Sequence, residues 1–292
     1  MAEIIFKKSH KRYCLIISII LLIYSFAYII EKSLIKFEDN IKRNLAEDNY
    51  ISLYFNSNCT YSQGFKNNYR NGISYIINKE NNKQLTDEDT LIINENFGIE
   101  IHFNIISINL EYFFSRNIDE NMKYLQYAYF DNLDTTLITN MKSAFQNCNS
   151  LSYIYLSDLD MSNVFEMDNM FDGCTSLDSV YLSNLDLSKV ISMGHLFNNC
   201  STLKNVYISD LKTSSLLYMA SMFEGCDSLT SIDISNFDTS LVSNIENLFY
   251  GCSSLTSINL SDFNTSSSFA MNGIFYGCDS LKYLDISNFD MK

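Results

Sequence analysis

One spacing organises the C-terminal half of this chain. Cysteines recur every 26 residues, and a phenylalanine three positions before each cysteine and a leucine three positions after it keep the same period. The cysteines are Cys148, Cys174, Cys200, Cys226, Cys252 and Cys278. Self-similarity at a fixed period in the range of about 20–50 residues marks a solenoid, in which each repeat covers the apolar face of its neighbour. Because solenoids usually bind other macromolecules, the spacing favours binding over catalysis.

Each repeat predicts a strand, a turn and a short helix. Residues 151–159 follow the order L-x-x-L-x-L-x-x-L, and Ile154 and Leu156 point to one face of a strand. A stripe with helical spacing comes next, formed by Val164, Met167, Phe171 and Cys174. Serines stand where the N-cap of that helix belongs, at Ser162, Ser188, Ser214, Ser240 and Ser266. Gly or Asn precedes every repeat cysteine, as expected for the left-handed residue that ends a helix.

A weaker repeat without cysteine precedes the others. Met122 takes the cysteine position, and the positions in register with the later repeats are Leu125, Phe130, Leu133, Asp134 and Ile138. At the other end the chain stops at Lys292, directly after the strand expected at 281–289. Solenoids normally carry an atypical closing repeat. We therefore expect either a partner that covers this edge or a longer natural chain.

The repeat resembles a known family. The run from Met222 to Ser240 is similar to the repeat of BspA-like leucine-rich-repeat surface proteins, and the resemblance covers residues 122–292. Membership implies a cell-surface or secreted protein used in adhesion or in binding host and matrix. Leu159 and Phe237 stand where ordinary leucine-rich repeats carry the asparagine of the turn. No ligand residues carry over, because the family has no fixed site motif.

The expected fold class is an α/β solenoid. Its leucine-rich-repeat stack has one parallel sheet, with short helices or turns on the convex side, and follows a transmembrane helix and a small β-rich cap. The expected domains are a cytoplasmic basic tail at 1–12, a transmembrane signal anchor at 13–30, a stalk and cap region at 31–121, and the solenoid at 122–292. Strands within the cap are expected at 72–77, 91–93 and 100–108.

The N-terminal segment predicts export. Residues 13–30 carry no charge, and at ~1.5 Å per residue a helix of that length spans roughly 27 Å, close to a bilayer core. Lys7, Lys8, Lys11 and Arg12 precede it, so the positive-inside rule places the N-terminus in the cytoplasm and the repeats outside. Small residues at Ser25 and Ala27 leave a cleaved signal peptide as the alternative, which gives a secreted protein.

Charge restricts the partners. The chain has a formal net charge of −14, and residues 141–292 hold six Lys, no Arg and seventeen Asp or Glu. This balance argues against nucleic acid, whose phosphates attract a basic face. We expect a protein or an extracellular-matrix-type macromolecule as partner, the membrane as a second partner through 13–30, and no small-molecule substrate.

The candidate reactive residues favour structure over chemistry. Each repeat offers a single cysteine on its apolar stripe and the chain has no CxxC, so a buried thiol ladder is favoured over disulfides or a metal site. His195 and Cys200 form no recognisable catalytic pair. Oxygen-bearing residues at the strand ends favour turn capping over calcium binding, and they are Asp158, Asn184, Asp210, Asn236, Asp262 and Asn288. We expect no enzyme, no cofactor and no metal.

The candidate binding site is the outward face of the strands. One column contains Tyr155, Tyr181, Tyr207, Asp233, Asn259 and Asp285, and the column two residues earlier begins with Tyr153. Tyrosine gives rigid, amphipathic contact area and is enriched at interfaces. The alternative is that tyrosine simply suits a strand surface. We select as partner-binding residues Tyr153, Tyr155, Tyr181, Tyr207, Asp233 and Asp285.

These features together predict a membrane-anchored recognition or adhesion protein with outward-facing repeats. A structural surface-coat protein without a specific ligand is the first alternative. An intracellular repeat scaffold is the second, and it applies if the first 30 residues do not direct export.

Export leads to a direct test. An epitope at residue 292 should be removed when protease is added to intact cells, because the basic flank and the uncharged run place the repeats outside. Immunoblotting before and after protease treatment measures this, with a cytoplasmic protein as the control for intact cells. Full protection of the epitope would contradict export.

Overall fold

The computed structural model describes residues 50–55, 59–62, 73–78, 83–85, 90–93, 98–103, 108–116 and 120–290. Contacts group Asp48–Lys292 into one unit, and everything below concerns this unit. The anchor and basic tail predicted at 1–30 lie outside the described residues. In the ranges given above, no helix combines the length and the apolar character needed to cross a bilayer.

An antiparallel sheet leads into the repeats. Its strand order is β4-β3-β6-β1-β8, from β4 (Lys83–Leu85), β3 (Ile73–Asn78), β6 (Gly98–Phe103), β1 (Tyr50–Phe55) and β8 (Leu125–Asn132). A separate antiparallel pair joins β2 (Cys59–Ser62) to β5 (Thr90–Ile93). Strand β1 buries Ile51, Leu53 and Phe55 at alternate positions, as a half-buried strand does. A β-rich region therefore precedes the repeats, as the sequence predicts.

Strand β8 joins this sheet to the stack. It pairs with β1 and also lies next to the first repeat strand, where the Ser152 amide donates to the Gln126 carbonyl at 3.4 Å. The 3₁₀ turn η1 (Glu120–Tyr124) enters β8, and η2 (Thr135–Leu137) and β9 (Ile138–Asn140) follow it. The apolar positions of the predicted cysteine-less repeat are buried, namely Met122, Leu125, Phe130, Leu133 and Ile138. That repeat is confirmed, and β7 (Ile108–Asn109) adds a further row by pairing in parallel with β9.

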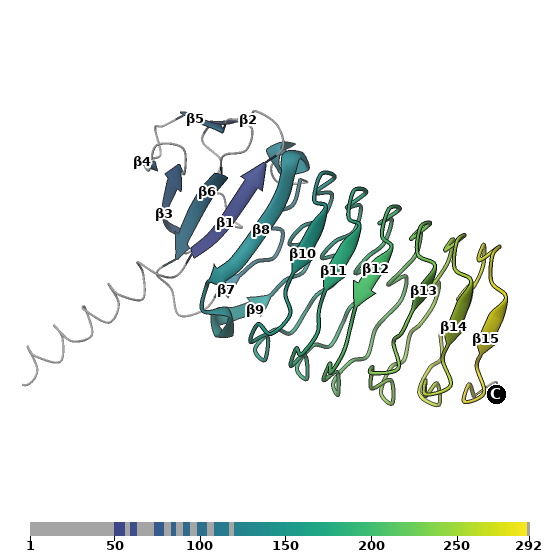
Figure 1. The fold of residues 1–292 in the computed structure, drawn as a ribbon. Helices are drawn as coiled ribbons and strands as arrows, with labels where there is room; N and C mark the ends of the chain where they lie inside the picture. Colours follow the sequence, from purple (N-terminus) through teal and green to yellow (C-terminus); the bar gives the residue numbers. More distant parts are fainter. Residues whose placement is uncertain are drawn as a thin grey trace, which may run out of the picture. The chain divides into compact units, whose positions relative to one another are not determined.

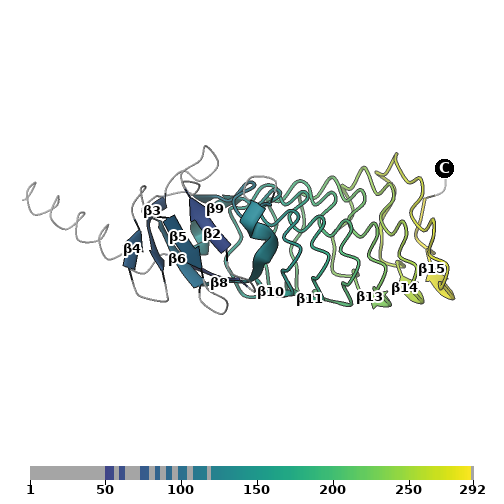
Figure 2. The same cartoon turned by 90° about the horizontal axis from the view of Figure 1, so that it is seen from above.

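The repeats form a parallel β-solenoid, whose 26-residue turns we call rungs. Their strands follow one another along the stack in Figure 1, and they are β10 (Tyr153–Tyr155), β11 (Ser179–Tyr181), β12 (Asn205–Tyr207), β13 (Ser231–Ile232), β14 (Ser257–Asn259) and β15 (Tyr283–Asp285). Equivalent residues pair without shift, so Ile154 faces Val180 and Val180 faces Val206. Viewed from above, the strands line one side of the stack and turns line the other (Figure 2).

The prediction of one parallel sheet is wrong. Strands β10-β11-β12 form one three-stranded sheet and β13-β14-β15 another, and within 120–290 β12 does not pair with β13. Val206 and Ile232, the inward residues on either side of this interruption, are partly exposed. The inward residues Ile154, Val180 and Ile258, where neighbouring strands pair, are almost fully buried. The interruption therefore opens the sheet face at one position.

The prediction of a short helix in each rung is also wrong, because the segment forms consecutive turns. Asn169, in the middle of the stripe, has a φ of 56°, a left-handed conformation that an α-helix does not accommodate. Alternate amides bond to the next rung instead of along a helix, as when Phe171 donates to the Leu196 carbonyl at 2.9 Å. The stripe is buried all the same, since consecutive turns also bring residues three or four apart to one side.

The predicted serine caps have a different role. The Ser162 amide and hydroxyl both donate to the Asp160 carboxylate, at 3.0 and 2.6 Å, so aspartate closes the turn. The same pairing recurs at Asp186–Ser188, Asp238–Ser240 and Asn264–Ser266. The residues before each cysteine do adopt positive φ, as predicted, at Asn147, Gly173, Asn199, Gly225, Gly251 and Gly277.

Two columns fill the interior. Phenylalanine rings stack from rung to rung with centroids 5.6 Å apart between Phe171 and Phe197, and the column begins with Phe114 on Phe145 at 4.8 Å. The six repeat cysteines are free and buried. Each thiol donates to a phenylalanine carbonyl of the preceding row, as Cys174 does to Phe145 at 3.1 Å. Burial raises the pKa of the Cys252 thiol to about 12, so the predicted thiol ladder is confirmed.

The interior is expected to reject charge but to tolerate a small polar group. Leu229→Asp should cost more than about 3 kcal/mol of unfolding free energy, because it buries an unpaired carboxylate. Cys226→Ser should cost on the order of 1 kcal/mol, because the hydroxyl keeps the Phe197 carbonyl as its acceptor. Chemical denaturation of the purified variants measures both. A harmless Leu229→Asp, or rapid reaction of native repeat thiols with a thiol reagent, would contradict this packing.

Two glycines with the same backbone conformation should differ in their tolerance of alanine. Gly173 and Gly251 have φ of 72° and 73°, so either alanine pays the strain of a left-handed residue, about 1–2 kcal/mol. A Cβ on Gly173 would also overlap the Asn147 side-chain oxygen, whereas on Gly251 the nearest atom is 3.7 Å away. We expect Gly173→Ala to be the more destabilising change, and Asn147→Gly to remove the difference. Equal midpoints of thermal unfolding for the two alanine variants would show that Asn147 simply rotates aside.

Candidate protein-interaction surface

Three of the predicted tyrosines form one continuous stripe. Tyr155, Tyr181 and Tyr207 are direct partners in the parallel register of β10, β11 and β12, and we call them the aromatic stripe. Their ring centroids lie 5.6 Å and then 4.6 Å apart, and the second pair is nearly parallel. Tyr155 is 51% exposed and Tyr207 47%. Stacking holds each ring on its neighbours and leaves the outer surface open to solvent.

The aromatic surface extends beyond the stripe. The Tyr153 ring lies 4.8 Å from that of Tyr127 on β8, and its hydroxyl hydrogen-bonds to that of Tyr129 at 2.8 Å, which raises the pKa of Tyr129. Tyr54 on β1 packs edge-on against Tyr129 at 5.6 Å. The sequence analysis missed Tyr54, Tyr127 and Tyr129. Tyr127 and Tyr129 stand 26 residues before Tyr153 and Tyr155, so the period itself could have identified them.

The two predicted aspartates lie past the sheet interruption. Asp233 follows Tyr207 in the same column on the next rung, and Asp285 is two rungs further, so neither contacts the aromatic stripe. Each caps its own turn by accepting the amide two residues later, Ser235 for Asp233 and Ser287 for Asp285, both at 3.0 Å. Hydrogen bonds from Ser235, hydroxyl first and amide second, lower the pKa of Asp233.

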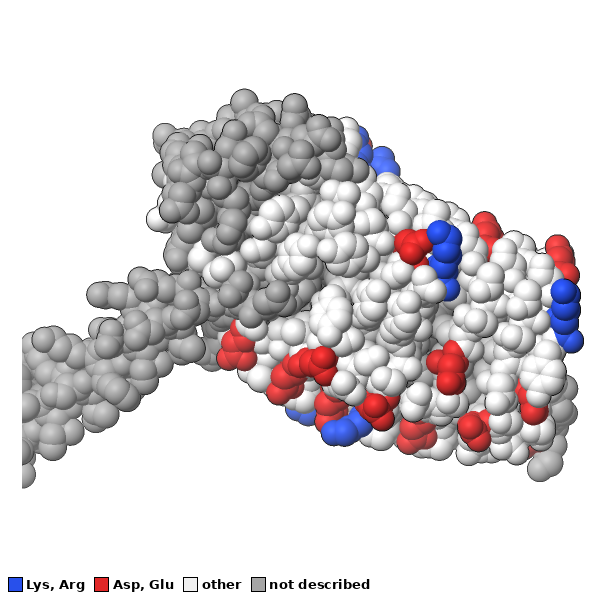
Figure 3. Space-filling model, viewed as in Figure 1, with Lys and Arg blue, Asp and Glu red and all other residues white. Residues whose placement is uncertain are grey.

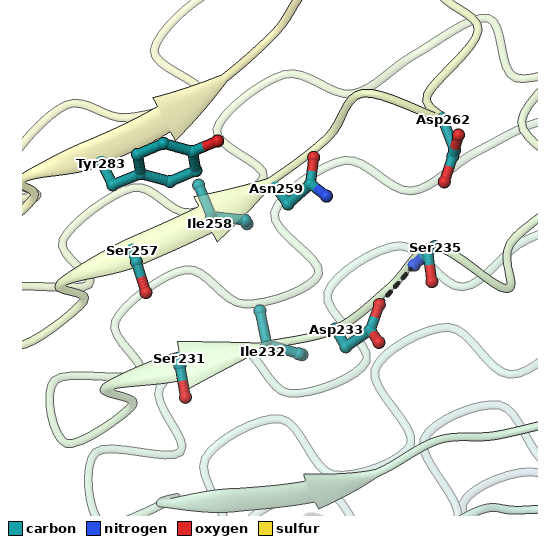
Figure 4. Close-up of a pocket in the computed structure, with 9 residues that line it drawn as sticks. All are labelled: Ser231, Ile232, Asp233, Ser235, Ser257, Ile258, Asn259, Asp262 and Tyr283. Atoms are coloured by element: carbon teal, nitrogen blue, oxygen red, sulfur yellow. Dashed lines mark hydrogen bonds between the residues drawn. The ribbon is translucent and has the colours of Figure 1, made fainter.

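A hollow of about 380 Å³ occupies the second sheet. It is open to solvent, and Figure 4 shows the residues around it, Ser231, Ile232, Asp233, Ser235, Ser257, Ile258, Asn259, Asp262 and Tyr283. Aliphatic floor residues come from β13 and β14, an aromatic ring comes from β15, and oxygen-bearing side chains complete the rim. We call this site the hollow.

Charge surrounds the strand face unevenly. In Figure 3 most of the face is uncharged, and acidic side chains gather along one edge of the stack. Two lysines are paired with aspartates of the preceding rung, Lys204 with Asp178 at 2.6 Å and Lys212 with Asp186 at 2.9 Å. The Ser188 hydroxyl and then Lys212 lower the pKa of Asp186 to about 2. These pairs are exposed and add little stability, but they neutralise nearby cations, so the face stays acidic.

The strand-end residues support turn capping. Asp158 and Asn184 both have positive φ, and the Asn184 amide donates to the Asp158 carboxylate at 2.8 Å across the rungs. Within the described ranges, no group of three or more His, Cys, Asp or Glu is placed to hold a metal ion. His195 occupies a left-handed turn position with a φ of 55° and lies 3.4 Å from the Asn198 side-chain amide.

A second apolar column lies outside the strand face. Phe165 and Ile191 are exposed at equivalent positions, and Tyr218 is exposed on the next rung. The Ile191 amide donates to the Phe165 carbonyl at 2.9 Å, so this column belongs to the ladder of isolated bridges that follows the turn after each strand. It offers a comparison surface with similar exposure but without stacked rings.

Comparisons with known proteins identify a family. A family model described as "Mycoplasma protein of unknown function, DUF285" matches residues 108–231 and 176–289. No curated protein matches. Among solved structures, "Crystal structure of T. pallidum Leucine Rich Repeat protein (TpLRR)" shares 24% identity over 46% of this chain and 68% of that chain, with a TM-score of 0.30.

Proposed function

Since the chain belongs to the DUF285 family, whose description assigns no function, we propose a function from its surface. The protein is a non-catalytic, protein-interaction repeat protein, and it binds a macromolecular partner through the aromatic stripe and the tyrosines that border it. The single observation that carries this proposal is the stacking of Tyr155, Tyr181 and Tyr207 on three successive rungs, with their outer faces exposed.

The arrangement of the rings supports binding more than sheet stability alone. An interface gains most from aromatic side chains that are already fixed before the partner arrives, because little conformational entropy is then lost. Tyr181 is held between two rings, and Tyr153 is fixed by a ring contact and a hydroxyl hydrogen bond. Together with Tyr127 and Tyr129 they make an extended surface of rigid phenol groups.

The acidic surroundings define the partner further. An interface usually has an apolar centre and a polar rim. Here the centre is the aromatic stripe and the rim carries aspartates, so a partner with an apolar centre and a basic rim fits best. Nucleic acid fits poorly, because phosphates would meet carboxylates of like charge.

We also propose where the protein acts. The uncharged run at 13–30 with its basic flank supports a single-pass membrane anchor with the repeats outside, or a secreted form after cleavage. In that location the partner is a protein or a matrix-type macromolecule, and the role is adhesion or recognition, as the resemblance to BspA-like proteins implies. The protease test described above decides the location.

A surface-coat role is the second candidate. The exposed column of Phe165, Ile191 and Tyr218 is a separate apolar surface on which copies of the chain could associate. A coat protein needs such self-association and no other ligand.

The recognition proposal is tested by changing the aromatic stripe to serine. Tyr155→Ser, Tyr181→Ser and Tyr207→Ser together should leave folding nearly intact, because the inward residues do not change. Partner binding should weaken by about 30-fold or more, since truncating one central aromatic residue commonly costs about 2 kcal/mol. The measurement is the dissociation constant for a partner captured by the wild-type protein, alongside a denaturation curve for each variant.

A triple serine variant of Phe165, Ile191 and Tyr218 is the matched control, because it removes a similar exposed apolar area from the other ladder. It should bind the partner like the wild type. An unchanged dissociation constant for the stripe variant would contradict the proposal. Self-association that only the control variant abolishes would favour the coat role.

A further inference from the structure

The hollow begins one rung after the aromatic stripe ends. Tyr207 is the last ring of the stripe, and Asp233, its successor in the same column, already lines the hollow. Figure 4 shows the Tyr283 ring on one side and the polar groups of Asp233, Asn259 and Asp262 toward the other. Tyr283 is 57% exposed, so its ring face is open to a ligand.

The lining of the hollow has one sign of charge. It contains the carboxylates of Asp233 and Asp262 and the side-chain amide of Asn259, and no Lys or Arg lines it. One oxygen of Asp233 accepts the Ser235 amide, so its second oxygen remains on the open side of the hollow. Two carboxylates beside an aromatic ring form an arrangement that favours a cation, through charge pairing and through the negative face of the ring.

The fold does not require these charges. Asn259 caps its turn by accepting the Ser261 amide at 3.0 Å, as Asp233 does with Ser235 one rung earlier. At the column of Asp262, the neighbouring rungs carry Asn236 and Asn288. A side-chain oxygen is enough at both positions, so the carboxylates of Asp233 and Asp262 are available for another role.

We propose that the hollow binds the basic side chain of an arginine or lysine that belongs to the same partner whose apolar segment lies on the aromatic stripe. This inference rests on the proposed function and specifies the partner. Two rungs separate β12 from β14, roughly 10 Å at ~4.8 Å per rung, which an extended chain spans in about three residues at ~3.3 Å each. The partner segment therefore runs along the stack, with its apolar residues about three positions away from a basic residue.

A small probe tests the hollow without the unidentified partner. N-acetylarginine amide is titrated into the purified full-length protein, with N-acetylcitrulline amide as a neutral probe of nearly the same shape. Nuclear magnetic resonance follows the Asn259 side-chain amide and the Tyr283 ring. We expect the arginine probe to shift both signals, to bind about fivefold or more tightly than the citrulline probe, and to weaken as salt is raised.

Two double variants locate the binding. Asp233→Asn with Asp262→Asn should abolish the preference for arginine and keep the fold, since Asn occupies the same columns in neighbouring rungs. Asp227→Asn with Asp279→Asn removes the same charge outside the hollow and should leave the preference unchanged. Equal binding of both probes, absence of shifts at Asn259 and Tyr283, or a retained preference in the hollow variant would overturn the proposal. None of these outcomes touches the stripe, whose serine variant tests the proposed function separately.

Discussion

Each rung depends on the main-chain carbonyl of its phenylalanine. The Phe171 carbonyl accepts the Cys174 amide of its own rung at 3.0 Å and the Cys200 thiol of the next at 3.1 Å. A buried carbonyl must find donors, so the residue three positions later must be small, apolar enough to be buried and able to donate. Cysteine satisfies all three conditions. The phenylalanine rings stack on the same register, so an insertion of one residue would disrupt the carbonyl pairing and the ring column together. This coupling explains why the period of 26 does not vary along the repeats.

The interior could therefore be predicted from the sequence, but the backbone of the convex side could not. Residues spaced three and four apart are buried on one side by a helix and equally by consecutive turns, so the stripe through Phe171 and Cys174 does not distinguish them. The deciding residues lie between, at Asn169, His195, Ser221 and Asn247, which all have positive φ. Polar residues at this column were the available signal. A reading of one repeat by itself also cannot show that alternate amides bond to the next rung, because that choice depends on stacking.

The binding surface was predictable only where it follows the period. The aromatic stripe follows from adding 26 to Tyr155, and the same arithmetic leads back to Tyr129, although that strand also belongs to the antiparallel sheet. Tyr54 joins the surface through the pairing of β1 with β8, a contact between distant parts of the sequence that no local pattern encodes. The separation between β12 and β13 has no sequence signal either, since Val206 and Ile232 are ordinary inward residues of their strands.

The interruption has a consequence for how a partner is recognised. Across it, the rungs of β12 and β13 are still held together on the turn side, where Ser221, Phe223 and Gly225 donate to carbonyls of the following rung at 2.8, 3.0 and 2.8 Å. Interior packing and turn pairing therefore keep the stack continuous while the strand face divides into two sheets. At this position the outward column changes from Tyr207 to Asp233. Outward residues carry no part of the inter-rung pairing, so their identity is free to differ between rungs. A single partner segment that crosses the division meets stacked aromatic rings on one side and carboxylates on the other, and the order of these two chemistries along the stack fixes the direction in which that segment binds.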